Sequence, residues 1–127
     1  MAARLKSQER RKAPRVSERV ALAVTDAKLT LRTETKNLSA SGAYCTLDRF
    51  LAPMTKLQLQ FELPDGPRHS TVRCAGVVVR VEPVVANAQQ GLYNVAIFFT
   101  EVAARDRSVI TRFVQRRLAA TTATATD

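Results

Sequence analysis

The hexapeptide Asn37-Leu38-Ser39-Ala40-Ser41-Gly42 lies between two runs of alternating apolar residues, one beginning at Leu29 and the other at Ala43. Asn and Ser side chains can hydrogen-bond to nearby backbone groups and hold a turn. Gly42 permits either a positive φ angle or a close approach of another group to its backbone. The stretch therefore predicts a corner between two β-strands. Two interpretations stay open for it: a plain polar turn, or a corner that grips a flat polar ligand.

Apolar and polar residues alternate on both sides of this corner, in short runs separated by turn signals. Residues 57–63 are the clearest case, because four apolar residues alternate with three polar ones. A turn at 64–67 follows, and Gly76 in the next run predicts a bulge or a barrel corner. Within that run, residues 77–79 are apolar enough to be buried on both sides. Six strands are expected, at residues 20–24, from 29 to the corner, 43–47, 57–63, 72–81 and 92–99, with a loop at 83–90.

The last apolar pattern has the period of a helix rather than a strand. Four apolar residues at i, i+3, i+4 and i+8 share one helical face, namely Ile110, Phe113, Val114 and Leu118. Three arginines fall largely on the other side, namely Arg105, Arg112 and Arg116. Residues 119–127 are rich in Ala and Thr, and we expect them to form a disordered tail. The pattern predicts a mainly β protein, a six-stranded antiparallel β-barrel with a C-terminal α-helix.

Positive charge is concentrated towards the two ends of the chain. The net charge of the 127 residues is +9. Residues 1–20 contribute +5 and residues 101–117 contribute +3, whereas the segment between them is nearly balanced. Two basic patches predict an anionic partner: nucleic acid, a nucleotide, an acidic lipid or an acidic protein face. The length is that of one domain, which we divide into a flexible basic arm (1–16), the barrel and helix (17–118) and the tail (119–127).

Several classes of function find no support in the sequence. Cys45 and Cys74 form no C-x-x-C motif, and we expect both to be reduced core residues. His69 is the single histidine, and the acidic residues form no recognisable pair, so neither acid–base catalysis nor a metal site is expected. No apolar run approaches 18 residues, and the charged N-terminus has no apolar signal segment. We therefore expect a cytoplasmic binding protein rather than an enzyme.

The basic arm contains an R-x-x-x-R spacing at Arg11 and Arg15, and Arg10 directly precedes it. The planar guanidinium group of Arg binds phosphate oxygens bidentately, and it also fits the O6/N7 edge of guanine. Two such side chains on a flexible arm can close over a ligand. The alternative is a generic basic tail, for which Lys would serve as well as Arg.

An R-x-x-x-R arm that is followed about one strand later by [D/N]-x-S-x-x-G resembles the PilZ domain family. Asn37, Ser39 and Gly42 complete the second motif, and the resemblance extends over residues 9–118. It implies a six-stranded barrel that binds the bacterial second messenger cyclic di-GMP. It further implies that the arm arginines contact guanine and phosphate, that the Asn and Ser side chains contact guanine, and that the Gly lets the base approach the backbone. Arg80 lies where some members place a side chain against the base.

The sequence thus predicts a cyclic di-GMP receptor without a cofactor, whose arm orders around the ligand and whose reshaped surface meets an unidentified effector protein. The dense arginines Arg10, Arg11 and Arg15 favour an intercalated dimer of the ligand over a single molecule. Two alternatives stay open. A nucleic-acid-binding barrel would use the basic arm and helix, but the seven aromatic residues fall mostly on predicted core faces. A nucleotide-free adaptor of the same fold would only dock on another protein.

Overall fold

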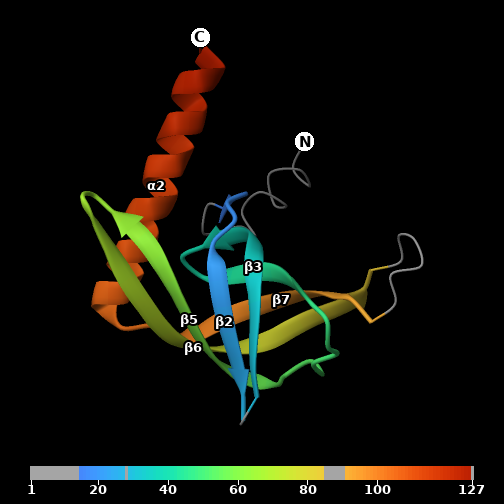
Figure 1. Ribbon diagram of the computed structural model, residues 1–127. Coiled ribbons are helices and arrows are strands. Elements are labelled where there is room, and N and C mark those ends of the chain that lie inside the picture. Colours follow the sequence, from blue (N-terminus) through green and yellow to red (C-terminus); the bar gives the residue numbers. More distant parts are fainter. Residues whose placement is uncertain (1–14, 28, 85–90, 127) are drawn as a thin grey trace, which may run out of the picture.

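The computed structural model describes residues 15–27, 29–84 and 91–126 of the chain (Figure 1). Most of these residues belong to β-strands, and one helix follows the last strand. In chain order, the elements are β1 (Arg15–Val16), β2 (Ala21–Asp26), β3 (Leu29–Ser39), β4 (Gly42–Leu47), β5 (Lys56–Asp65), β6 (Arg68–Pro83), β7 (Tyr93–Glu101) and α2 (Ala104–Thr126).

Six of these strands close into a barrel. Their order is β3-β2-β5-β6-β7-β4, every neighbouring pair is antiparallel, and β4 pairs back with β3. Closure gives each of the six strands a hydrogen-bonding neighbour on both sides for part of its length, whereas residues 68–74 of β6 pair with β5 alone. The predicted six-stranded antiparallel barrel with a C-terminal helix is confirmed. The short strand β1 is an addition that the sequence pattern did not predict.

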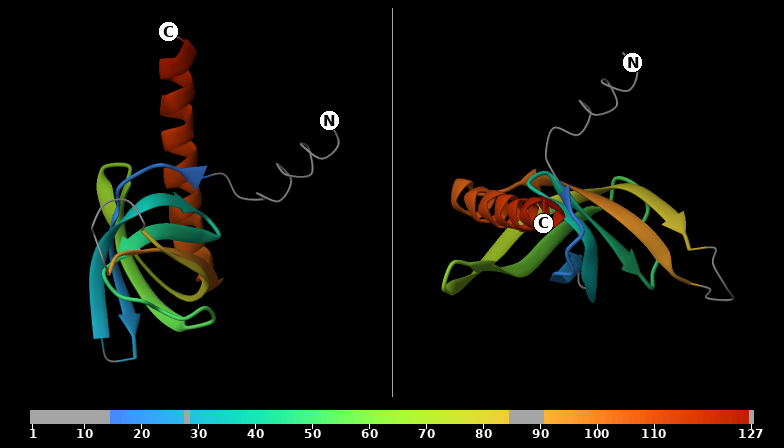
Figure 2. Two further views of the ribbon diagram at one scale, coloured as in Figure 1. Left: turned by 90° about the vertical axis from the view of Figure 1, so that its right-hand side faces the viewer. Right: turned by 90° about the horizontal axis from the view of Figure 1, so that it is seen from above.

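The core follows from the two periodicities in the sequence. In β5 the alternating apolar residues all point inwards and are buried, namely Leu57, Leu59, Phe61 and Leu63. Helix α2 adds a second set of buried side chains against the barrel, namely Val109, Ile110, Phe113 and Val114. Full burial of such a side chain contributes about 1.5–3 kcal/mol. The helix packs through its N-terminal half, and its C-terminal half extends beyond the barrel (Figure 2).

The corner between β3 and β4 is tighter than expected. Strand β3 runs through Asn37 to Ser39, so only Ala40 and Ser41 make the turn before β4. The reason is the β3–β4 ladder, which uses the backbone of this segment for strand pairing.

The predicted flexible arm included residues 15 and 16, but both pair with β3, and Val16 is buried. Residues 1–14 lie outside the described part of the chain.

The C-terminal end also differs from the expectation. We expected a disordered tail from residue 119, but α2 continues to Thr126. The segment after Ala104 contains no Gly or Pro to end the helix, and Ala has the highest helix propensity of all residues. An Ala- and Thr-rich composition therefore did not exclude a helix. Asp127 lies outside the described residues.

One carboxylate joins the β5–β6 hairpin to α2. Asp65 accepts hydrogen bonds from Arg112 Nε at 3.2 Å, Arg112 Nη2 at 3.0 Å and Ser70 Oγ at 3.1 Å. Arg116 Nη1 lies 3.7 Å from the same carboxylate. The hydrogen bond from Arg112 is the main cause that lowers the pKa of Asp65 below its usual value. Two of the three arginines expected on the free polar side of the helix are thus partly neutralised by the barrel.

Candidate functional site

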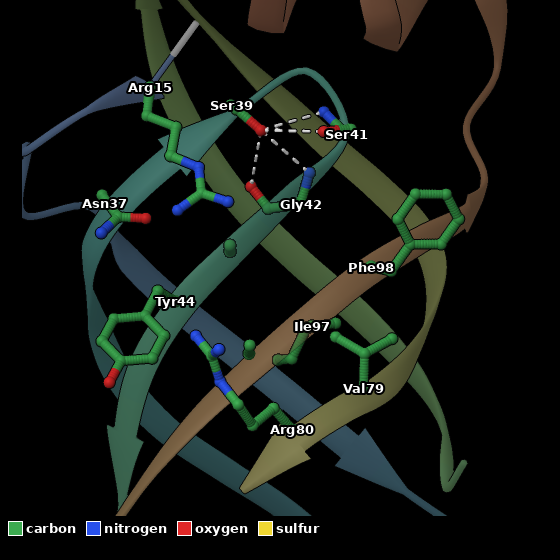
Figure 3. A pocket seen from close by; sticks show the side chains of 12 residues that line it. Arg15, Asn37, Ser39, Ser41, Gly42, Tyr44, Val79, Arg80, Ile97 and Phe98 are labelled. Atoms are coloured by element: carbon green, nitrogen blue, oxygen red, sulfur yellow. Dashed lines mark hydrogen bonds between the residues drawn. The ribbon is translucent and has the colours of Figure 1, made fainter. Parts of the chain in front are cut away.

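A shallow groove with a volume of about 130 Å³ opens on the outer surface of the barrel, where β3, β4, β7 and β6 lie side by side (Figure 3). The lining residues are Arg15 from β1, Asn37 and Ser39 from β3, Ser41 from the turn, Gly42, Ala43 and Tyr44 from β4, Val79 and Arg80 from β6, and Ala96, Ile97 and Phe98 from β7. The groove therefore joins residues that lie far apart in the sequence.

Five of the seven residues expected to bind a ligand line this groove, namely Arg15, Asn37, Ser39, Gly42 and Arg80. Figure 3 shows the guanidinium group of Arg15 directed into the groove between Asn37 and Gly42. Arg10 and Arg11, the other two expected residues, lie outside the described part of the chain. The barrel thus brings Arg15 of the R-x-x-x-R motif and all three residues of the second motif onto one face.

The hydroxyl group of Ser39 holds the corner together. Its Oγ accepts hydrogen bonds from the backbone N–H groups of Ser41 and Gly42, both at 3.2 Å, and lies 3.2 Å from Ser41 Oγ. Ser39 itself is buried. These bonds satisfy two backbone donors of the turn. Ser39 therefore acts first on the shape of the corner.

Gly42 is required by the packing of the barrel itself. It pairs with Phe98 across the β4–β7 ladder, and a Cβ atom at this position would collide with the carbonyl oxygen of Ile97. Of the two roles that the sequence left open for this glycine, close approach is therefore the one that applies. The missing side chain also leaves bare backbone on the groove floor, opposite Phe98 on the neighbouring strand.

A β-bulge in β3 turns Asn37 into the groove. Thr35 points into the core and pairs with Cys45, whereas the next cross-strand pair is Asn37 with Tyr44, so Lys36 is the extra residue. In a regular strand Asn37 would point inwards like Thr35, because side chains alternate between the two faces. The bulge reverses this alternation. Asn37 therefore faces outwards, and Leu38 is fully buried in the core.

A second bulge, in β6, does the same for Arg80. Val78 pairs with Ile97 and Arg80 pairs with Ala96, so Val79 is the extra residue. Both Val79 and Arg80 face outwards as a result, and Val79 is 52% exposed. The prediction that residues 77–79 are buried on both sides was wrong at this position. A further register shift lies next to Gly76, but its extra residue is Thr100 of β7, because Ala75 pairs with Glu101 and Gly76 pairs with Phe99.

The charge of the groove comes from two exposed arginines. Arg15 lies at the β3 side of the groove and Arg80 at the β6 side. The Nε atom of Arg80 lies 3.3 Å from Glu82 Oε1 in an exposed ion pair. Exposed pairs of this kind contribute about 0–1 kcal/mol, so a bound anion can compete for the guanidinium group. Two guanidinium groups on opposite sides of the groove suit a ligand with more than one anionic group.

Sequence reasoning missed two large groove residues. Tyr44 and Phe98 both face outwards on their strands and line the groove. The alternation in β7 contained the signal for Phe98, because Ile97 and Phe99 are both buried on the inner face. An aromatic residue between two core positions must point to the outer surface.

Both thiol groups of the chain lie in the core. Cys45 and Cys74 are free and buried, as expected, and burial raises the pKa of Cys45 to about 12 and that of Cys74 to about 11. Such thiols are un-ionised near neutral pH and react poorly. Within residues 15–27, 29–84 and 91–126, no cluster of His, Cys, Asp or Glu could hold a metal ion. In the same ranges no helix has both the length and the apolar character to cross a membrane.

The sequence matches the PilZ domain family over residues 9–116, and the chain belongs to this family. None of the curated proteins searched matches the chain. Among solved structures, the Bacillus subtilis inhibitor of motility (MotI/DgrA) is 20% identical, with a TM-score of 0.75 over 86% of this chain and 51% of that one. The PilZ domain of Escherichia coli YcgR, solved with c-di-GMP, is 16% identical, with a TM-score of 0.66 over 93% of this chain and 98% of that one. The chain spans about half the length of the Bacillus subtilis protein.

Proposed function

We propose that this protein is a cyclic di-GMP receptor that binds the nucleotide in the groove between β3 and β6. One observation carries the proposal: Arg15, Asn37, Gly42 and Arg80 line a single groove on the outer barrel face. Membership of the PilZ family supports it, as does the similarity in fold to a YcgR domain solved with this ligand. A guanine nucleotide supplies both of the features that these residues can recognise, a flat base with a polar edge and an anionic phosphate.

The chemistry of the lining residues favours guanine over adenine. An arginine fork can donate to both O6 and N7 of guanine, whereas adenine presents an amino donor in place of O6. Asn37 adds an amide oxygen and an amide nitrogen, which can pair with donors and acceptors on a base edge. The bare backbone at Gly42 lets a flat ring lie close to the strand. Ser39 keeps this corner in shape through its bonds to the two following N–H groups.

The proposed mechanism is ordering of the arm by the ligand. Arg10 and Arg11 precede Arg15 in the sequence, so a ligand in the groove lies within reach of them. Closure of the arm over the nucleotide would add guanidinium groups to its phosphates and create a new surface. That surface is where an effector protein would bind. The signal would thus pass to the effector as a change in one face of the barrel.

Isothermal titration calorimetry tests the proposal directly. Cyclic di-GMP should bind with a Kd in the low micromolar range or tighter, which corresponds to about −8 kcal/mol. Cyclic di-AMP is the matched control, since it has the same cyclic sugar–phosphate backbone and differs in the edge of its bases. It should bind much more weakly. Equal binding of the two would overturn the guanine-edge argument. Absence of any binding would favour the nucleotide-free adaptor.

Salt dependence separates the receptor from a nucleic-acid-binding protein. A dinucleotide has two phosphate charges, so its affinity should fall only gently between about 0.05 and 0.2 M salt. A protein that follows a nucleic-acid backbone through 6–10 phosphate contacts would lose roughly 10³–10⁵ in affinity over that range. Tight binding of single-stranded nucleic acid at about 0.2 M salt, without binding of cyclic di-GMP, would contradict the receptor proposal.

A further inference from the structure

Phe98 exposes an aromatic ring in the groove. It lies on the outer face of β7, and half of its surface is accessible (50%). Three of the other phenylalanines are buried in the core, namely Phe61, Phe99 and Phe113. The remaining one, Phe50, is similarly exposed (55%) but does not line the groove, and its ring packs edge-on against Tyr93. Among the described residues, no comparable ring contact is recorded for Phe98.

The surroundings of Phe98 form an apolar shelf beside bare backbone. Its cross-strand partner on one side is Gly42, which has no side chain. On the β6 side, the bulge turns Val79 outwards into the same groove. In Figure 3 the Phe98 ring and Asn37 lie at opposite ends of the groove, and Gly42 lies between them. Val79 lies beside Ile97. The groove therefore has a polar end and an apolar end.

An exposed ring is stabilised when a flat apolar surface covers it, because water is released and the two π systems attract each other. The faces of a nucleobase provide such a surface, and stacking on an aromatic side chain is largely independent of which base is present. The polar end of the groove, where Figure 3 shows Tyr44 near Asn37, can read the edge of a base, whereas Phe98 presents its ring at the apolar end. The two ends thus suit two different parts of one ligand.

We propose that Phe98, with Val79 at its edge, is the stacking platform for one base of the bound dinucleotide. The proposal rests on the receptor function proposed above and adds a division of roles to it. Phe98 supplies affinity without selecting the base, whereas Arg15, Asn37 and Arg80 supply the preference for guanine.

The absence of tryptophan from the chain allows a direct optical test. Phe98→Trp places a single tryptophan in the groove, and Phe50→Trp places a single tryptophan at a similarly exposed site outside it. Stacking of guanine on the indole ring should quench the fluorescence of the first variant during titration with cyclic di-GMP. The second variant should keep its emission at the same ligand saturation, measured by calorimetry. Saturated binding without quenching in Phe98→Trp would overturn the stacking role.

Affinity measurements test the same role with the natural ring removed. Phe98→Ala should weaken the binding of cyclic di-GMP roughly tenfold, and Phe98→Leu should lie between that variant and the native protein. Phe50→Ala is the matched control and should bind like the native protein. Circular dichroism melting of each variant checks that the barrel is intact. The ratio of the affinities for cyclic di-GMP and cyclic di-AMP should stay the same in Phe98→Ala, whereas Asn37→Ala should reduce it.

The two proposals fail in different ways. If the native protein does not bind cyclic di-GMP, the receptor function and the stacking role both fall. If the native protein binds and a folded Phe98→Ala variant binds equally well, only the stacking role is overturned. A loss of affinity in Phe98→Ala with a changed preference between the two nucleotides would overturn the division of roles.

Discussion

Arg15 pairs with Ser39 in the ladder between β1 and β3, so the last arginine of the R-x-x-x-R spacing lies beside the serine of the corner. The next residue, Val16, is buried and anchors the short strand to the barrel. The backbone of Arg15 is therefore held in place while its side chain stays exposed in the groove. A side chain on a fixed backbone loses less conformational freedom on binding than one on a free arm.

We expect Arg15→Ala to weaken cyclic di-GMP binding by about tenfold or more, because a charge-assisted hydrogen bond contributes about 1.5–3 kcal/mol. The exposed side chain makes no contact that the core needs, so the free energy of unfolding should change by less than about 0.5 kcal/mol. Calorimetry and thermal melting measure the two effects. Arg49→Ala is the control, since Arg49 is exposed and does not line the groove. Unfolding of Arg15→Ala would show that this arginine is structural.

Ser39→Ala should affect both shape and binding. It removes the oxygen that accepts the N–H groups of Ser41 and Gly42, which should lower the free energy of unfolding by about 1–2 kcal/mol. Binding should weaken because the corner is no longer held. Ser41→Ala is the matched control, because it keeps both backbone hydrogen bonds and removes only a hydroxyl group. A Ser39→Ala variant as stable as Ser41→Ala would contradict the structural role of this hydroxyl.

Arg10 is expected to determine how many ligand molecules bind. An intercalated dimer of cyclic di-GMP carries four phosphate charges and needs more cationic groups than one molecule does. Arginine can also stack its flat guanidinium group on a base, which leucine cannot do. Calorimetric stoichiometry should give two ligands per native chain and a value nearer one for Arg10→Leu. A native ratio of one that the substitution leaves unchanged would remove the dimer and keep the receptor.

Gly42→Ala should destabilise the barrel directly. The new Cβ atom would collide with the carbonyl oxygen of Ile97, which is backbone and can move only if β4 and β7 separate. Overpacking of this kind costs about 1–3 kcal/mol. Urea unfolding of the ligand-free protein measures the effect without reference to binding. An unchanged midpoint would mean that β4 can shift without loss of its pairing with β7.

The Asp65 carboxylate should make stability depend on pH. Its pKa in the folded protein is lowered, chiefly by the hydrogen bond from Arg112, so its ionised form favours the folded state. The stabilisation should be complete above the ordinary pKa of an aspartate and should be lost as the pH falls through the lowered pKa of the folded state. Asp65→Asn should therefore lower Tm by a few degrees at pH 7 and make no difference at strongly acidic pH. Asp48→Asn is the control for the loss of one negative charge, because Asp48 is exposed.

The sequence alone was sufficient for the six barrel strands and for the packed half of the helix, because both depend on local periodicity. Alternation at residues 57–63 predicted β5 and its inward face, and the 3.6-residue period at Ile110 and Phe113 predicted the buried side of α2. The order of the two motifs along the chain also indicated which residues to expect near one another. Composition failed where it was the only guide, in the Ala- and Thr-rich segment that continues α2.

Only the tertiary structure decided that the side chains of Asn37 and Arg80 face the groove. Regular alternation would point Asn37 and Arg80 into the barrel, and the bulges at Lys36 and Val79 turn both outwards. A bulge is a property of the pairing between two strands, and β6 and β7 pair across a register that no local segment encodes. The need for glycine at position 42 likewise arises from the carbonyl group of Ile97, which lies on another strand. The residue types of the site can therefore be read from the chain, whereas their directions depend on contacts that exist only once the barrel has closed.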